Sequence, residues 1–133
     1  MNENYERCKH TADKVTDIAQ GKWYKCPECD EIFEWDDETE CPNCESVFDE
    51  SEMIPFSLYD YILDNCDVEL RIDGRTKAFK SCKVCVAYGG PSIYIDTGDR
   101  KVKLYWWNEY AEAYLDHEVC DDIDEIIERY YYE

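Results

Sequence analysis

The clearest indication of the architecture is "SIYIDTGDRKVKLYWW", which runs from Ser92 to Trp107. Apolar and polar side chains alternate on both sides of Thr97-Gly98-Asp99, which is typical of two antiparallel strands joined by a turn. The inward-facing positions of this predicted hairpin are Ile93, Ile95, Val102, Leu104 and Trp106. The sequence therefore predicts an antiparallel sheet with one apolar face.

Two further strands are predicted on the N-terminal side of the hairpin. Val68, Leu70 and Ile72 alternate with polar residues, and "DGRT" (residues 73–76) is typical of a turn. The next run, "AFKSCKVCVAY" (residues 78–88), is rich in residues that favour strands and ends at the breaker "GGP". The sheet is therefore expected to begin near Val68.

Two helices are predicted before the sheet. Apolar residues recur at spacings of three and four in the first helix, and Gly21 is its expected C-terminal stop. These apolar residues are Tyr5, Cys8, Ala12, Val15, Ile18 and Ala19. A short helix within residues 55–66 has Ser57 as its expected N-cap, with Leu58, Tyr61 and Ile62 on one face.

A last helix is predicted after Asp116. Its apolar stripe consists of Val119, Ile123, Ile126, Ile127 and Tyr130. The opposite side is expected to carry Asp121, Asp122, Asp124, Glu125 and Glu128. Helices that pack on an antiparallel sheet make an α+β fold, and this is the predicted class.

Four cysteines precede the sheet in two Cys-Pro-x-Cys turns, with the spacing Cys26-x2-Cys29-x11-Cys41-x2-Cys44. Two residues between thiolates let one tight turn direct both sulfurs at one ion, and a second turn completes a tetrahedron. The spacing predicts a zinc site, with iron as the alternative metal. Four thiolates leave no open coordination position, so the predicted role of the ion is structural.

Residues 24–49 resemble the zinc ribbons with rubredoxin-type knuckles. The resemblance implies that Cys26, Cys29, Cys41 and Cys44 are the ligands. The sequence differs from this family at two positions: Asp30 and Glu45 stand where a glycine commonly follows each knuckle. The expected organisation is then an N-terminal amphipathic helix (1–22), a zinc ribbon (23–52) inserted between helices, and an α+β domain (53–133).

The chain is strongly acidic, with a formal net charge of −19. Residues 26–66 carry fourteen acidic groups and no basic ones, and residues 109–133 carry ten acidic groups and one basic. Such a surface repels phosphate and attracts basic partners. The nine cysteines and the lack of a long apolar run or a signal peptide predict a cytoplasmic protein with reduced thiols, without membrane contact.

The whole chain also resembles, in size, acidity and α+β character, the phage-encoded anti-CRISPR proteins that inhibit type II RNA-guided nucleases. The resemblance implies a non-enzymatic inhibitor that binds a basic lobe of the nuclease, in a bacterial host cell, and prevents target DNA from loading. The residues predicted to contact this partner are Glu34, Trp35, Asp36, Asp37, Glu38, Glu40, Asp121, Asp122, Asp124 and Glu125. Phe33 and Phe48 are instead expected in the core of the ribbon.

Two alternatives stay open at this point. One is a zinc-stabilised adaptor that binds some other basic protein. The other is a single-strand nucleic-acid platform, because basic and aromatic side chains alternate on the expected outer face of the sheet. Its candidates are Arg71, Lys83, Tyr94, Lys101, Lys103, Tyr105 and Trp107, which could also be paired with the acidic C-terminal helix.

The remaining chemistry-bearing residues give weaker signals. Cys82 and Cys85 form a second CxxC, but in a strand these two positions face opposite sides, so a buried Cys82 is expected rather than a second metal site. Cys66 and Cys120 are expected in the core. His10 and His117 lie in no recognised catalytic motif. A Cys120 nucleophile paired with His117 on one helix face is the alternative that the sequence offers for catalysis.

Overall fold

The computed structural model describes residues 3–34, 41 and 54–132 of the 133-residue chain. Its elements follow in this order: α1 (Glu3–Ala19), β1 (Trp23–Lys25), β2 (Ile32–Glu34), β3 (Ile54–Pro55), α2 (Leu58–Leu63), β4 (Asp67–Ile72), β5 (Phe79–Ala87), β6 (Ser92–Asp96), β7 (Lys101–Trp106), β8 (Glu109–Tyr114), α3 (His117–Ile127) and the π-helical turn η2 (Glu128–Tyr132). The predicted α+β class is confirmed.

The larger sheet has five strands in the order β4-β5-β6-β7-β8, all antiparallel to their neighbours. The predicted hairpin is β6–β7, in which Ile95 lies opposite Val102 and Ile93 opposite Leu104. Because strands that follow each other in sequence are also neighbours in space, each connection is short.

The fifth strand, β8, was not predicted from the sequence. It follows β7 through a two-residue turn at Trp107-Asn108, because Trp106 pairs with Glu109. Trp107 was predicted on the outer face of the sheet, and that position is wrong: its φ is 58° and its side chain is 87% exposed. A positive φ at this position is what a tight hairpin turn of the favoured hand needs.

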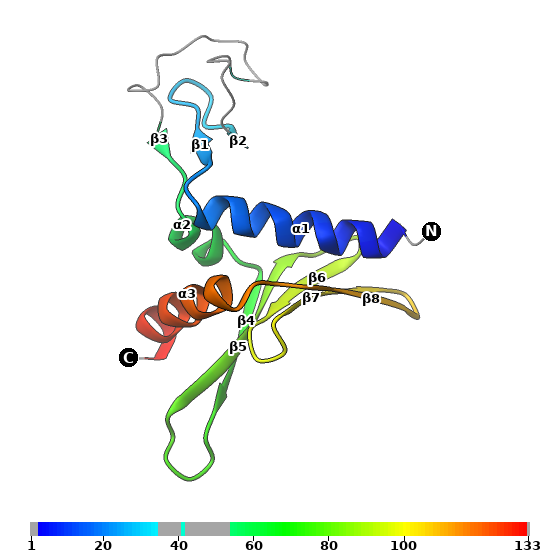
Figure 1. The fold of residues 1–133 in the computed structure, drawn as a ribbon, viewed down its shortest axis with the longest axis vertical. Coiled ribbons are helices and arrows are strands. Elements are labelled where there is room, and N and C mark those ends of the chain that lie inside the picture. The colour runs from blue at the N-terminus through cyan, green and yellow to red at the C-terminus, as the bar shows by residue number, and fades with distance from the viewer. Residues whose placement is uncertain (1–2, 35–40, 42–53, 133) are drawn as a thin grey trace.

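One face of the five-stranded sheet is covered by helices, as Figure 1 shows for α1 and α3. α1 packs on β7 and β8, and α3 packs on β5 and α2. The fully buried side chains between these layers include Ile18, Ile62, Ile95, Leu104, Ile123 and Ile127. Each contributes roughly 1.5–3 kcal/mol by leaving water, and together they fix the helices on the sheet.

Helix boundaries follow the sequence signals closely. Gly21 ends α1 with a φ of 80°, in the left-handed region that a C-terminal stop requires. Ser57 caps α2, because its hydroxyl oxygen accepts a hydrogen bond from the Asp60 amide at 3.1 Å. Asp116 likewise caps α3.

Three apolar residues differ from their predicted burial and are exposed: Tyr5, Ile72 and Tyr130.

The smaller sheet has three strands in the order β2-β1-β3 and lies beside α2, away from the five-stranded sheet (Figure 1). Its third strand comes from Ile54–Pro55, so the chain returns to β1 just before α2 begins. The division at residues 22 and 52 stays a prediction. Among the described residues, no helix combines the length and the apolar character needed to cross a bilayer.

Candidate metal centre

Three of the four predicted ligands lie together at one end of the smaller sheet. The sulfur atoms of Cys26, Cys29 and Cys41 all lie within 4.8 Å of one another, and those of Cys29 and Cys41 are 3.6 Å apart. A tetrahedral zinc ion with Zn–S bonds of about 2.3 Å places its sulfurs about 3.8 Å apart. The three cysteines therefore form a cluster that fits a metal ion.

The first knuckle is shaped by its own backbone. The Cys26 amide donates to the Glu31 carbonyl at 2.8 Å, and the Asp30 amide donates to the Cys26 carbonyl at 3.0 Å. The Glu28 amide points at the Cys26 sulfur, 3.4 Å away. An N–H group directed at a sulfur favours the thiolate, which is the form that binds metal.

Asp30 takes the place of the glycine that zinc ribbons commonly have after the knuckle. Its φ is 65°, in the left-handed region. Asp tolerates this region better than most residues because its short side chain interacts with the local backbone. The substitution therefore leaves the first turn intact, whereas Glu45 of the second knuckle lies outside the described residues.

The cysteine cluster is shielded from water. Cys26 and Cys41 are fully buried, and Phe33 packs beside them as predicted. Burial raises the pKa of the Cys26 thiol to about 11, so without a cation this thiol stays protonated at neutral pH. A bound divalent ion would reverse that preference, because its charge stabilises the thiolates.

Several predicted site residues fall outside the part of the chain that the structure describes. They are Cys44, Trp35, Asp36, Asp37, Glu38, Glu40 and Phe48. Glu34 is described and lies at the end of β2, opposite Trp23. Its pKa is raised, first by a hydrogen bond with Asp17 of α1, so two carboxyl groups meet where the smaller sheet joins α1.

On α3, the structure separates one predicted contact residue from the others. Asp121, Asp122 and Glu125 are exposed, as expected. Asp124 is not on the exposed side: it is half-buried and accepts hydrogen bonds from the Thr97 hydroxyl at 2.6 Å and the Cys82 thiol at 3.5 Å. Burial, its largest influence, raises the pKa of Asp124. The prediction that Asp124 lies on the exposed acidic side of this helix is therefore wrong, because its carboxylate faces the sheet.

The outer face of the larger sheet gathers the predicted basic residues, but its own carboxylates neutralise most of them. Arg71 donates to both oxygens of Asp96, at 2.6 and 2.7 Å. Lys103 donates to the same carboxylate at 3.1 Å. Lys101 pairs with Glu112 at 2.6 Å. The alternative, pairing with the acidic C-terminal helix, is not found for these three residues in the described part of the chain, because their partners come from the sheet itself.

Lys83, the fourth basic residue of this face, lies over aromatic rings. Its ammonium group is 4.6 Å from the ring centre of Tyr94 and 5.4 Å from that of Tyr105. Asp96, which holds two of the basic residues, is only 1% exposed and was not singled out from the sequence. The neighbouring Arg71 and Lys103 hold the pKa of Asp96 well below its usual range, against the opposing effect of its burial.

The other cysteines lie mostly as expected. Cys82 packs in the core beside Val84, and Cys85 lies on the opposite side of β5 across from Tyr94, so the second CxxC does not bring its two sulfurs together. Cys120 is buried and Cys66 is exposed, which is contrary to the prediction for Cys66.

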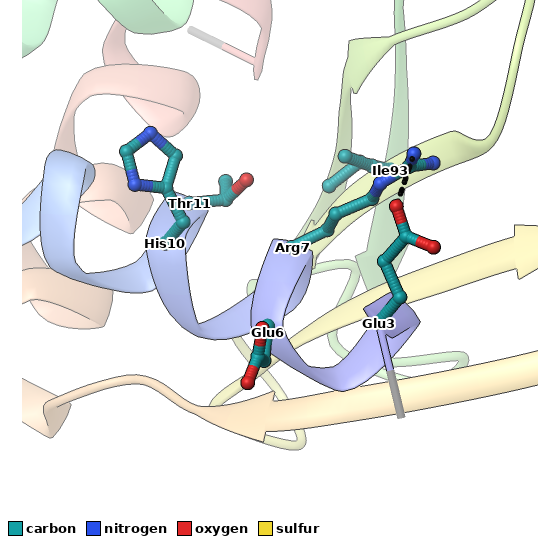
Figure 2. A pocket seen from close by; sticks show the side chains of 6 residues that line it. All are labelled: Glu3, Glu6, Arg7, His10, Thr11 and Ile93. Atoms are coloured by element: carbon teal, nitrogen blue, oxygen red, sulfur yellow. Dashed lines mark hydrogen bonds and ion pairs between the residues drawn. The ribbon is translucent and has the colours of Figure 1, made fainter. Parts of the chain in front are cut away.

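A hollow of about 450 Å³ lies along the N-terminal half of α1, and Ile93 of β6 also lines it (Figure 2). Arg7 donates to Glu3 across it at 3.2 Å. Figure 2 shows His10 and Glu6 pointing away from this pair, so the polar groups do not converge on one point.

No protein family, curated protein or solved structure matches the chain significantly. Its function must therefore be argued from its own residues.

Proposed function

We propose that this chain is a zinc-binding, non-catalytic acidic protein that binds a basic surface of a nucleic-acid-binding protein. The observation that carries the proposal is the exposed acidic side of α3. Asp121 and Asp122 face solvent there, and within the described part of the chain no Lys or Arg pairs with either of them. Glu125, the third exposed carboxylate of this side, pairs with Arg129 at 3.3 Å, but the two unpaired carboxylates keep the side negative and therefore complementary to a groove that otherwise holds phosphates.

The metal would give the smaller sheet its stability. Cys26, Cys29 and Cys41, with Cys44 proposed as fourth ligand, would hold zinc in a closed thiolate site of the zinc-ribbon type. Zinc is favoured over iron because closed sites of four thiolates at this spacing are typical of structural zinc, and a structural role needs no redox-active ion. The ion would supply folding free energy and hold the acidic segment between the cysteines.

In its narrower form, the proposal is that the chain inhibits a type II RNA-guided nuclease in the cytoplasm of a bacterial host, as a product of a phage or mobile element. Such nucleases hold the guide–target heteroduplex in a positively charged channel. The acidic side of α3, together with Glu34 and the acidic residues that follow it, would occupy this channel and prevent target DNA from loading.

The same attraction between acidic side chains and a basic surface also suits a different partner. The second form of the proposal is therefore a zinc-stabilised adaptor that binds some other basic protein. The nucleic-acid platform is disfavoured, because Arg71, Lys101 and Lys103 already pair with carboxylates. A strand of nucleic acid would have to break these pairs while approaching a strongly negative molecule.

The test is target cleavage by a guide-loaded type II nuclease to which the zinc-loaded protein is added before the DNA. We expect cleavage to stop at a stoichiometric ratio, and labelled DNA or RNA mixed with the protein alone to show no gel shift. The double variant Asp121→Asn/Asp122→Asn should weaken inhibition. The matched control is Glu6→Gln/Asp67→Asn, which removes two exposed charges elsewhere. Normal cleavage by nucleases of several bacteria would contradict the narrower form.

A further inference from the structure

A second hollow lies between the smaller sheet and α2, next to the metal-binding knuckle. Its volume is about 470 Å³, and residues of all three strands of the smaller sheet line it, together with Asp30, Phe56, and Asp60 and Asp64 of α2 and its C-cap. In Figure 1 the chain passes from β3 directly into α2, so the hollow lies where the smaller sheet meets this helix.

Two apolar side chains flank Lys25 on the floor of this hollow. Ile32 of β2 and Ile54 of β3 both pair with Lys25 of the central strand, so the three side chains form one row across the sheet. Ile32 is 37% exposed and Ile54 is 45% exposed. Single exposed isoleucines are common, but two at the bottom of one hollow leave an apolar surface open to a ligand.

Carboxylates of α2 form the opposite wall. Asp60 lies in α2 and Asp64 is its C-cap, and the Asp64 amide donates to the Asp60 carbonyl at 3.3 Å, so both residues line the same end of the hollow. One oxygen of Asp60 is engaged by Ser57, whose hydroxyl donates at 2.8 Å. Among the described residues no basic group pairs with Asp64. Two like charges at this spacing repel each other, and a cation between them would remove that cost.

The single basic residue of the hollow is turned toward a third carboxylate. The Lys25 ammonium group lies 3.7 Å from Asp30. Because Asp30 follows the knuckle and its amide is bonded to the Cys26 carbonyl, this ion pair lies on the cysteine side. With three carboxylates against one ammonium group, the hollow is negative, and its negative charge is concentrated on the α2 wall.

We propose that this hollow binds an arginine side chain of the partner protein. The methylene groups of arginine would lie on Ile32 and Ile54, and the planar guanidinium would donate to Asp60 and Asp64. Arginine fits better than lysine, because its guanidinium sheds water more easily and its fork of donors can reach two carboxylates at once. The inference rests on the proposed function, for which it names one point of contact.

Other ligands fit the hollow less well. A phosphate would face three carboxylates and be repelled. A divalent cation needs ligand atoms that converge, and among the described residues the only such group is the cysteine cluster. A purely apolar ligand would cover the floor but would take the charges of the wall out of water without a partner.

The experiment uses the full, zinc-loaded chain with carbon-13-labelled isoleucine methyl groups. It is titrated with the blocked peptide Ac-Gly-Arg-Gly-NH2 and, in parallel, with the same peptide containing citrulline, the neutral isostere of arginine. We expect saturable methyl shifts at Ile32 and Ile54 with the arginine peptide only. Ile72, which is 43% exposed on the larger sheet, serves as the internal reference and should not move.

Asp64→Asn should weaken the arginine peptide about two- to fivefold, as expected for the loss of one exposed charge contact. Asp122→Asn is the matched control on another helix and should leave the affinity unchanged. The inference is overturned if Ile32 and Ile54 do not move, if the citrulline peptide moves them equally, or if Asp64→Asn has no effect. These outcomes are independent of the nuclease assay, so inhibition without arginine binding would reject the hollow alone. Arginine binding without inhibition would reject the narrower proposed function alone.

Discussion

The two sheets of this molecule hold their strands together by different means. Eighteen buried residues form the core between the five-stranded sheet and the helices, whereas only Phe33, Cys26 and Cys41 are buried in the second cluster of the described chain. Three residues cannot offset the conformational entropy of ordering the smaller sheet. On the described residues, the larger part is held together by excluding water, and the smaller part has a cysteine cluster that could add the binding free energy of a metal ion.

The largest expected effect comes from removing the metal. Chelation, or Cys26→Ser, should unfold the smaller sheet, because a structural zinc ion contributes on the order of 10 kcal/mol. Amide spectra should then lose the dispersed signals of residues 23–34 and keep those of the five-stranded sheet. Cys66→Ser is the control, since Cys66 is exposed and outside the cluster. Loss of both sheets together would show that the two parts do not fold separately.

The converse change breaks the larger sheet without touching the cysteines. Asp96→Asn removes a buried charge that holds both Arg71 and Lys103, and leaves Arg71 without its carboxylate and Lys103 with Asp99 alone. We expect a loss of about 3–5 kcal/mol in the free energy of unfolding, measured by urea denaturation at pH 7. Affinity for zinc should stay the same. An unchanged midpoint in urea would contradict the central role of this carboxylate.

The same carboxylate sets a pH dependence whose sign can be worked out. Because the folded-state pKa of Asp96 is lowered, its contribution is complete above the unfolded pKa of about 3.9 and is lost as the pH falls below it. The difference in unfolding free energy between wild type and Asp96→Asn should therefore shrink steadily below about pH 4. Comparing the two proteins cancels the acid sensitivity of the cysteine cluster, which they share. A difference that stayed constant down to pH 2 would contradict the lowered pKa.

A smaller effect is expected at the contact between α3 and the sheet. Thr97→Val removes the hydroxyl that donates to Asp124 and accepts from the Cys82 amide at 2.9 Å. We expect a loss of about 1–3 kcal/mol from the groups left unpaired. Because the Thr97 bond lowers the already raised pKa of Asp124, the variant should also titrate this carboxyl at higher pH. Carbon-13 NMR of the carboxyl groups would measure the shift, with the exposed Thr76→Val as control.

Most of the larger fold could be predicted because its signals are local. The period of α1, the Ser57 cap and the alternation in β6 and β7 each depend on residues close in sequence. β8 was missed because its inward residues, Ala111 and Ala113, are small and have a low preference for strands. Small residues are found there because α1 packs directly on this strand.

In the candidate site, too, the features with local sequence signals were predicted and those that depend on distant partners were not. The spacing of Cys26, Cys29 and Cys41 predicted a cluster that the structure shows. Asp96 and Thr97 could not be found from the sequence, since their importance comes from partners up to 27 positions away. β3 was also missed, because a two-residue strand has no periodicity and exists only through its pairing with β1.

The packing of α1 on β8 also has a consequence for synthesis on the ribosome. α1 cannot pack on β8 until this strand has emerged, about ninety residues later. At ordinary rates of translation the delay is roughly 5–20 s. The cysteine knuckles need no such distant partner, because all their residues emerge soon after the helix. The three cysteines of the cluster can therefore meet a metal ion while α1 is still exposed and before the five-stranded sheet is complete.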